Sequence, residues 1–282
     1  MNQHQQRKSL LCPNCRRLIS GNEHTCPYCG MKNPTSRWKG LLARSMRDGK
    51  ELLRILIIVN VAMYVLSILL SPRSTGFSFN PLFFLSPDSR SLLLLGASGY
   101  IPIDRLHRWW SLVSANYLHG SIMHLLFNMY ALNQIGPLIL QEYGNYRMFI
   151  IYTLSGVLGF LVSYLAGVKF TIGASAAVCG LIGAALFYGK SRGGIYGQAI
   201  YKQISGWAIG IFLFGFLLPS INNWAHGGGM LAGAGIAFLV GYRERNRETN
   251  GHKVAAYICI FVTAAVLAWA VFGALFYRLF AR

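Results

Sequence analysis

Seven apolar stretches of helical length follow one another along the 282-residue chain, with polar segments between them. They cover residues 55–70, 111–140, 147–166, 175–188, 204–218, 226–242 and 254–277. Only 12% of the residues are charged, which is about half the fraction usual for a soluble domain. This pattern predicts an all-α polytopic membrane protein whose helices cross the bilayer in alternating directions.

Positive charge predicts the orientation of these helices. The net charge of +18 could indicate nucleic-acid binding, but the basic residues lie at the N-terminus and in loops between apolar stretches. Most of the 26 Lys and Arg residues fall on the side of the membrane that holds the N-terminus. Because cytoplasmic loops are enriched in Lys and Arg, we expect a cytoplasmic N-terminus and no nucleic-acid partner. The polar, basic start predicts no secretory signal peptide.

Two C-x-x-C pairs, separated by ten residues, precede the first apolar stretch. Their cysteines are Cys12, Cys15, Cys26 and Cys29. Paired thiolates at this spacing suit a tetrahedral zinc ion, whereas two disulfides or four reduced thiols without a ligand are the alternatives. Almost no apolar residue lies between the pairs, so the segment lacks a core without a metal. We therefore predict a small structural zinc ribbon, in which four cysteines leave no place for His24.

The fourth apolar stretch opens on a Gly-x-Ser sequence that ends at Ser175 and is followed by small residues. Small residues allow close helix packing in a bilayer, and a serine there often bonds to a carbonyl one turn earlier. Another glycine-rich stretch, however, begins near His226. Serine and histidine together indicate a nucleophile and its base. A second Gly-x-Ser sequence, at Ser98, is rejected because Pro102 prevents a membrane helix from continuing there.

His124 and Asn128 are four residues apart in the second apolar stretch and therefore share one helix face. They could simply hydrogen-bond to each other and hold helices together. His119, roughly 140° around the same helix, is less expected on that face. In the predicted topology both residues, like Ser175 and His226, lie near helix starts at the outer face, so that all four share a similar depth.

The chain offers no carboxylate for a Ser-His-Asp triad. Between Asp104 and Glu244 the only acidic residue is Glu142, which the predicted topology places at the inner face. A nucleophilic Ser175 would therefore act with His226 as a dyad.

These motifs, in this order on successive helices, resemble those of rhomboid intramembrane serine proteases. The resemblance covers residues 55–242 and rests on the His-Gly-Ser-x-x-His-Leu-x-x-Asn, Gly-x-Ser and Ala-His-x-x-Gly-x-x-x-Gly sequences. It implies that Ser175 is the nucleophile and His226 the base. It also implies that His124 and Asn128 help to form the oxyanion hole. The substrates that it implies are single-span membrane proteins, cut in or near the outer membrane boundary without a cofactor.

Two positions depart from the family pattern. Ala176 follows the serine where the family usually has glycine, and its methyl group could crowd the substrate or the N–H group of Ser175. Ser111 follows Trp110 where the family favours Trp-Arg, which affects the outer loop more than the chemistry. The seventh stretch resembles members that carry one extra C-terminal helix.

We therefore predict four segments in a multi-pass protein of the bacterial inner membrane. They are a zinc-ribbon-like cytoplasmic domain (1–36), a basic juxtamembrane segment (37–54), a rhomboid-like six-helix core (55–242), and a cytoplasmic loop with a seventh helix and tail (243–282). The expected partners are the bilayer, the substrates and a cytoplasmic partner of the ribbon. One alternative is a pseudoprotease that binds client segments without cutting them. Another is a transporter or channel, which predicts internal repeats that the sequence lacks.

Overall fold

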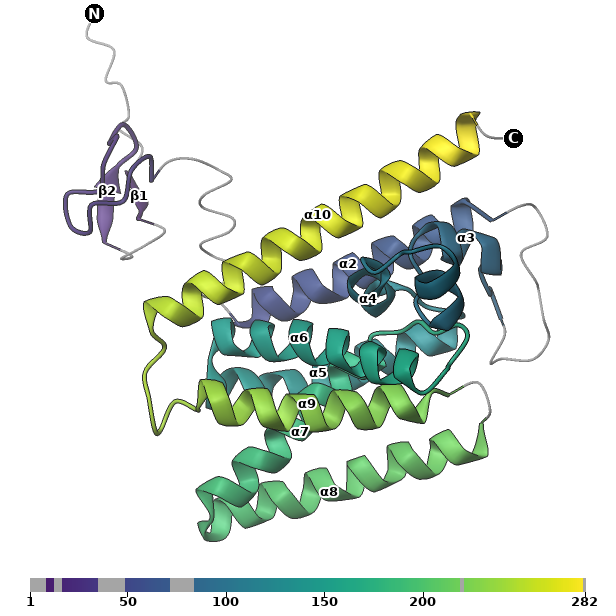
Figure 1. Ribbon diagram of the computed structural model, residues 1–282. Coiled ribbons are helices and arrows are strands. Elements are labelled where there is room, and N and C mark those ends of the chain that lie inside the picture. Colours follow the sequence, from purple (N-terminus) through teal and green to yellow (C-terminus); the bar gives the residue numbers. More distant parts are fainter. Residues whose placement is uncertain (1–8, 13–16, 35–48, 72–83, 219–220, 281–282) are drawn as a thin grey trace, which may run out of the picture. The chain divides into compact units, whose positions relative to one another are not determined.

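Long apolar stretches of the sequence form the helices of the larger of two units in the computed structural model (Figure 1). The structure describes residues 9–12, 17–34, 49–71, 84–218 and 221–280. The units are Met1–Ile55 and Leu56–Arg282. The long helices are α2 (Gly49–Leu69), α5 (Ile122–Tyr143), α6 (Asn145–Leu165), α7 (Ser175–Arg192), α8 (Gly194–Leu217), α9 (Asn223–Val240) and α10 (Asn250–Phe280). The short ones are α3 (Ser89–Leu94), η2 (Ile101–Arg105), α4 (Ser111–Ser114) and η3 (Ala115–Tyr117).

Four of the described helices, α2, α6, α8 and α10, are long and apolar enough to cross a membrane. The other three long helices, α5, α7 and α9, do not meet the same criterion of length and apolar composition. The structure confirms the predicted all-α polytopic class, and with it an integral membrane protein. Most helix bounds lie within a few residues of the predicted stretches, but α8 begins at Gly194 instead of residue 204.

The second apolar stretch does not form the single helix that the prediction for His119 assumed. The chain runs through α4 and η3, and α5 begins only at Ile122. Ser121 is extended, and its hydroxyl accepts a hydrogen bond from the N–H of His124 at 3.2 Å. A serine cap of this kind starts a new helix. His119 therefore precedes α5, and its position relative to His124 does not follow from helical geometry.

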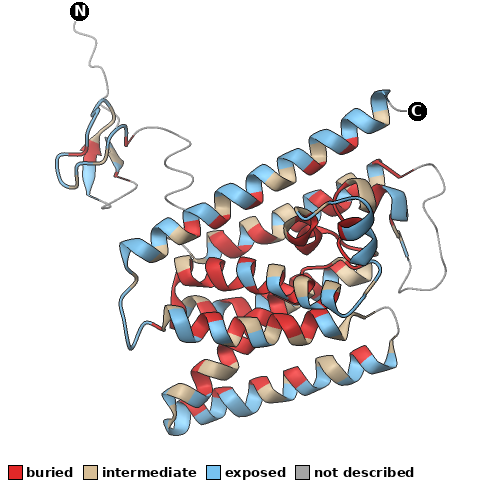
Figure 2. Cartoon of the chain, viewed as in Figure 1, coloured by how far each residue is buried: buried red, intermediate tan, exposed pale blue. Residues whose placement is uncertain are grey.

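Glycine contacts hold α6, α7 and α9 together in the middle of the larger unit. Gly229 of α9 lies against the carbonyl of Ala176, and Gly233 lies against Gly180. A methyl group on Gly159 of α6 would come within 2.7 Å of the Ala225 carbonyl oxygen. Side chains are thus excluded where backbones meet, as in other closely packed membrane helices. Figure 2 shows these central helices as mostly buried, whereas α8 and α10 expose much of their surface.

Segments predicted to lie on the same side of the membrane meet at the same end of the larger unit. At the end that holds Ser175, backbone hydrogen bonds join Ser98 to Thr171 in both directions. At the opposite end, the N–H of Arg243 donates to the carbonyl of Glu142 at 2.7 Å. Each of these contacts joins two segments that the predicted topology places on the same side of the membrane.

Glu248 completes the N-terminus of α6 from the linker between α9 and α10. Its Oε1 accepts hydrogen bonds from the N–H groups of Tyr146 at 3.0 Å and Arg147 at 3.3 Å. The first N–H groups of a helix have no partner within the helix, and Gly144 at the N-cap supplies no side chain. The guanidinium of Arg147 also donates to the carbonyl of Arg247 at 3.0 Å. The linker is thereby fixed to the α5–α6 turn.

The N-terminal unit contains a short antiparallel hairpin of β1 (Ser9–Leu11) and β2 (Leu18–Ser20). Leu10 pairs with Ile19 across the hairpin, and both pack with Cys12 and Cys26. A few apolar side chains therefore do pack around the cysteines, although the sequence between the cysteine pairs suggested almost none.

Candidate active site

Ser175 and His226 lie at the same end of two neighbouring helices. Ser175 is the first residue of α7, and His226 is in the first turn of α9. The contact of Gly229 with Ala176 fixes the register of the two helices, which run in the same direction. His226 is one turn before Gly229, and Gly173 is the same number of residues before Ala176. His226 therefore lies level with the turn that leads into Ser175.

Gly173 is the point at which the candidate side chains converge. Its φ angle is 128°, in a region that favours glycine, and its N–H donates to the carbonyl of Ala115 at 2.9 Å. A methyl group on Gly173 would lie 2.7 Å from Nε2 of His124 and 3.5 Å from Oγ of Ser175. Any larger residue would therefore fill the space in which the two side chains face one another.

His124 has the hydrogen-bonding state that an oxyanion donor requires. Its Nδ1 accepts a hydrogen bond from the N–H of Gly120 at 3.4 Å. In a neutral imidazole one ring nitrogen accepts and the other donates, so Nε2 carries the proton. That N–H lies beside Gly173 and Ser175.

His226 is buried, with 7% of its surface exposed, and its Nδ1 has no hydrogen-bond partner. In the described part of the chain, no carboxylate forms a hydrogen bond or ion pair with it. Glu142 binds Tyr196 at the opposite end, and Asp104 accepts from the hydroxyl of Tyr164 at 2.7 Å. The arrangement is compatible with the dyad that the sequence predicts and leaves no acid for a triad.

Ser175 is partly exposed, and its hydroxyl makes no hydrogen bond with another described group, His226 included. The N–H groups in the first turn of α7 also lack partners within the helix. Ser175 and His226 thus lie at the same end of two packed helices without a hydrogen bond between them. Catalytic hydrogen bonds are often long or misaligned in enzymes without substrate, so this geometry does not exclude the dyad.

Asn128 is buried on the same helix face as His124, as its spacing predicts. Its Nδ2 donates to the carbonyl of His124 at 3.0 Å, a bond within α5. The amide carries a second N–H that this bond leaves free. In this structure Asn128 therefore supports α5 and still has a donor to offer.

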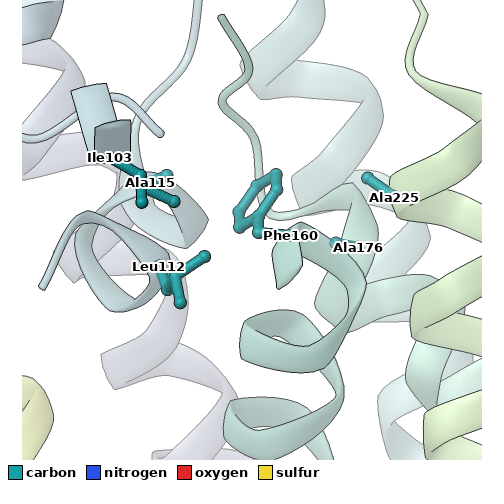
Figure 3. Packing of buried hydrophobic residues seen from close by; sticks show 6 residues of the cluster. All are labelled: Ile103, Leu112, Ala115, Phe160, Ala176 and Ala225. Carbon is teal, nitrogen blue, oxygen red and sulfur yellow. The ribbon is translucent and has the colours of Figure 1, made fainter. Parts of the chain in front are cut away.

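The methyl group of Ala176 does not crowd the site. Ala176 is fully buried and packs with Phe160 of α6 and Ala225 of α9 (Figure 3). This cluster also includes Ile103, Leu112 and Ala115. An alanine in place of glycine thus fills the helix interface and leaves the space beside Ser175 unchanged.

Ser98 has a structural environment of its own. It is fully buried, bridges to Thr171 through its backbone, and its Oγ accepts a hydrogen bond from Ser111 at 3.2 Å. No described histidine interacts with it. Ser111, the departure from the Trp-Arg pattern, thus has a partner in the outer loop.

Sequence reasoning missed two residues that position the site. His119 is fully buried, and its ring packs edge-on against His124 with 5.1 Å between centroids. Asn222 caps α9 by accepting from the N–H of Ala225, and it donates to Thr171 at 2.9 Å. An asparagine three residues before the helical N–H that it binds is a recognisable cap, so the sequence contained this second signal.

The cysteines of the N-terminal unit form a candidate metal centre. Sγ atoms of Cys12, Cys26 and Cys29 lie within 4.8 Å of one another, and none of the three is in a disulfide. Cys12 and Cys29 are 3.7 Å apart, close to the ~3.8 Å expected for two thiolates on a tetrahedral zinc with bonds of about 2.3 Å. These residues therefore fit a zinc ion, while Cys15 lies outside the described residues.

Comparison with known proteins agrees with this architecture. The model of the Rhomboid domain matches residues 106–243, from the outer loop to the end of α9. The chain is 34% identical over 209 residues to RHOMBOID-like protein 6, mitochondrial, from Arabidopsis thaliana, which covers 68% of each protein. The fold is that of a polytopic helical membrane protein, in which the helix after the Gly-x-Ser sequence and the helix of His226 carry a polar site at one end. The chain belongs to the rhomboid family.

Relatives in this family differ in the activity that their names state. The chain is 31% identical over 156 residues to Rhomboid protease GluP from Bacillus subtilis (strain 168), covering 55% of this chain and 31% of that protein. It is also 31% identical over 159 residues to Inactive RHOMBOID-like protein 8 from Arabidopsis thaliana, covering 55% and 44%. The chain spans half to about two thirds of the length of the other plant relatives, between 50% and 68%. With both plant and bacterial relatives, the predicted bacterial inner membrane is not supported.

Proposed function

We propose that the protein is an intramembrane serine endopeptidase that cleaves single-span membrane proteins in or near the membrane. Ser175 is its nucleophile and His226 its base. The observation that carries the proposal is the convergence on Gly173, where Nε2 of His124 and Oγ of Ser175 flank one small space. The backbone of Gly173 itself favours glycine, and the absence of a side chain there leaves the space between His124 and Ser175 open to a substrate.

The chemistry follows from the donors around that space. The proton of the Ser175 hydroxyl passes to Nε2 of His226, and Oγ bonds to the carbonyl carbon of the substrate. The N–H groups of His124 and of the first turn of α7 stabilise the negative charge on the carbonyl oxygen. His226 then returns the proton to the leaving amine, and the C–N bond breaks. Water hydrolyses the acyl-serine by the same route, which regenerates the hydroxyl.

The Ser175 end of the helices is proposed to face the outside of the cell or compartment. The predicted topology puts most of the basic residues, those of the N-terminal segment included, on the other side of the membrane, and such residues favour the cytoplasmic side. Partial exposure of Ser175 supplies the water that hydrolysis requires. The bilayer and single-span substrates are then the partners of this site.

A pseudoprotease is the second candidate, and two observations favour it. No hydrogen bond links Ser175 to His226 among the described contacts, and one relative is named inactive. Binding a client segment without cleavage would require no such bond.

Cleavage of a model single-span substrate by the purified protein separates the two functions. We expect Ser175→Ala and His226→Ala each to abolish cleavage, and the double variant to be no worse than either, because the pair acts as a unit. Ser98→Ala, which removes a buried hydroxyl away from the site, should cleave at nearly the normal rate. A fluorophosphonate should label wild-type protein on Ser175. Normal cleavage by Ser175→Ala, or labelling of Ser98, would exclude the assignment.

We also propose that Cys12, Cys15, Cys26 and Cys29 hold one structural zinc ion on the cytoplasmic side. Purified protein should contain about one zinc per chain, and Cys12→Ser with Cys15→Ser should lose it. Metal content unchanged in that variant would contradict the site. Since the ribbon is proposed to lie across the membrane from Ser175, a chain that starts at Arg37 should still cleave the model substrate. The ribbon would then bind a cytoplasmic partner.

A further inference from the structure

A groove runs between α2 and α10, which lie side by side in the larger unit (Figure 1). We call it the α2–α10 groove. Four side chains of α2, between Ile58 and Met63, and five of α10, between Leu267 and Leu275, line it, and all nine are apolar. Its volume of 530 Å³ falls within the range of about 300–1,000 Å³ that is usual for ligand sites. Met63 is buried, whereas Ile58 is 53% exposed, so the groove is open to the surroundings of the helices.

The groove extends over the depth of about one membrane leaflet. From Leu267 to Leu275, α10 rises about 12 Å, at 1.5 Å per residue. The first α2 residue of the groove, Ile58, is already the tenth of the 21 residues in that helix. The hydrocarbon core of a bilayer is about 30 Å thick, so that each leaflet contributes about half. An acyl chain ends near the bilayer centre, whereas a spanning helix continues through both leaflets. The depth of the groove therefore fits an acyl chain.

The last turns of α2 and α10 meet α3 at one end of the groove. Directly after α2, Oγ of Ser71 accepts a hydrogen bond from the N–H of Asp88 at 2.9 Å. Nη2 of Arg90 donates to the hydroxyl of Tyr277 at 2.7 Å, and the guanidinium lies 5.3 Å from the centroid of that ring. Since α3 leads directly to the backbone bridge of Ser98, this is the end of the unit that holds Ser175. Arg90 is thus fixed against the last turns of α10.

Arg278 continues the groove face of α10 beyond Leu275. It follows Leu275 by three residues and Val271 by seven, so all three lie on the same helix face. Its side chain forms no hydrogen bond or ion pair with another described residue. The described acid beside these arginines is Asp88, whose carboxylate accepts from the N–H of Arg90 and caps α3. Two arginines and one acid leave this end of the groove positively charged.

We propose that the α2–α10 groove binds one phospholipid of the leaflet at the Ser175 end. One acyl chain lies along the groove, and Arg278 and Arg90 hold the phosphate. Arginine suits a phosphate because it can donate two parallel hydrogen bonds, and Arg90 uses only one of its five donors on Tyr277. Apolar burial gives little preference for one lipid inside a bilayer, so the phosphate contacts and the fit of the chain select this lipid over its neighbours. The site does not depend on the proposed protease function.

Native mass spectrometry of the full-length protein in detergent, titrated with palmitoyl-oleoyl phosphatidylglycerol, tests the groove. We expect a saturable adduct of one lipid per chain. Ala268→Phe fills the groove from α10 and Ala62→Phe from α2, so each should abolish this adduct. Val262→Phe is the control, because Val262 is 42% exposed on α10 and does not line the groove. Circular dichroism checks that each variant is folded. A wild-type adduct in both filling variants, or an equal loss in Val262→Phe, would overturn the site.

Exposed arginines test the phosphate contacts with little risk to folding. Arg278→Gln and Arg90→Gln each remove a charged donor, so each should weaken binding of phosphatidylglycerol by about tenfold. Arg105→Gln removes another exposed arginine at the same end, in η2, and should bind as the wild type does. Unchanged binding in both Arg278→Gln and Arg90→Gln, or an equal loss in Arg105→Gln, would overturn the assignment of the phosphate.

Two further outcomes of the titration concern the identity of the occupant. Palmitoyl-oleoyl glycerol has the same chains without a phosphate, so it should bind wild-type protein about as weakly as phosphatidylglycerol binds Arg278→Gln. Equal affinity of the wild type for both lipids would overturn the role of the phosphate. A dimer that replaces the lipid adduct and disappears in Ala268→Phe would overturn the lipid in favour of a second copy of the chain. Absence of fluorophosphonate labelling would count against the protease proposal and leave the lipid site unaffected.

Discussion

The helices that carry the candidate site and the helices at the periphery are built in opposite ways. In α8 and α10 only 22% of the most apolar window is buried, and large apolar side chains face outward. In α7 and α9 the contact surface consists of glycines and small residues, and the polar candidates lie at one end. Of the four candidate spans α10 is the most apolar and α8 the least, yet both are equally little buried, whereas 56% of the window in α6 is buried. Lipid accepts apolar side chains as readily as a protein interior does, so exposed large apolar side chains distinguish the peripheral helices, and small residues at the contacts distinguish the helices that hold the site.

The sharpest test of this contrast uses two glycines on the same helix. Gly233→Ala places a methyl group against the backbone of Gly180, whereas nothing lies within 4 Å of a methyl group on Gly235. Overpacking against rigid backbone should destabilise the fold by about 3 kcal/mol or more. Gly235→Ala should be neutral or stabilising by up to about 1 kcal/mol, because alanine favours helix. Thermal unfolding in detergent measures both. Equal stability of the two variants would contradict the packing of α7 on α9.

Asn128 offers a second test, on activity. Removal of one oxyanion donor costs about 10²–10³ in turnover, so Asn128→Ala should slow cleavage by about that factor while the protein remains folded. The control is Ser205→Ala on α8, which removes a polar group outside the candidate site and should cleave at the wild-type rate. Unchanged turnover in Asn128→Ala would show that the residue only supports α5 through its bond to the His124 carbonyl.

Glu248 and Glu244 allow a comparison within one linker. Glu248→Ala leaves the N–H groups of Tyr146 and Arg147 without their acceptor, which should cost about 1 kcal/mol, as for other lost helix caps. Glu244 pairs with Arg192 at 3.0 Å, but both side chains are well exposed, so Glu244→Ala should cost less than about 1 kcal/mol. Denaturation of both variants under one condition checks the order. A larger loss for Glu244→Ala would contradict the capping role.

The smallest effect is expected at the lipid-facing surface. Leu213→Ala on α8 truncates a side chain that is 60% exposed, so thermal unfolding in bilayer nanodiscs should shift little. Leu132→Ala in α5, where the leucine is fully buried, should cost about 2–5 kcal/mol. Similar losses at both positions would indicate that α8 is covered by protein.

The sequence predicted helices well and contacts poorly, for physical reasons that particular residues show. Apolar length determines a membrane helix, so α6 and α10 were found close to their observed bounds. The prediction of one helix over the second stretch was wrong, because the serine cap at Ser121 starts a new helix within an apolar run whose hydropathy does not change there. His119 was misplaced for the same reason, since its contact with His124 comes from a turn.

The site residues show a similar division. The spacing of His124 and Asn128 correctly predicted a shared helix face, because helical periodicity is local. The role of Gly173 as the point between His124 and Ser175 depends on tertiary packing, which the sequence does not contain. The harmless burial of the Ala176 methyl group likewise depends on Phe160 and Ala225, which come from other helices.

The cap that Glu248 provides has a consequence for synthesis of the protein. A ribosome completes α6 at Leu165, 83 residues before it adds Glu248, so the first N–H groups of α6 must bind water or lipid head groups in the interval. The α5–α6 turn can therefore reach its final form only after the α9–α10 linker emerges. A chain truncated after Tyr242 would insert all residues of the candidate site. The first N–H groups of α6, at the end farthest from Ser175, would still lack the carboxylate of Glu248.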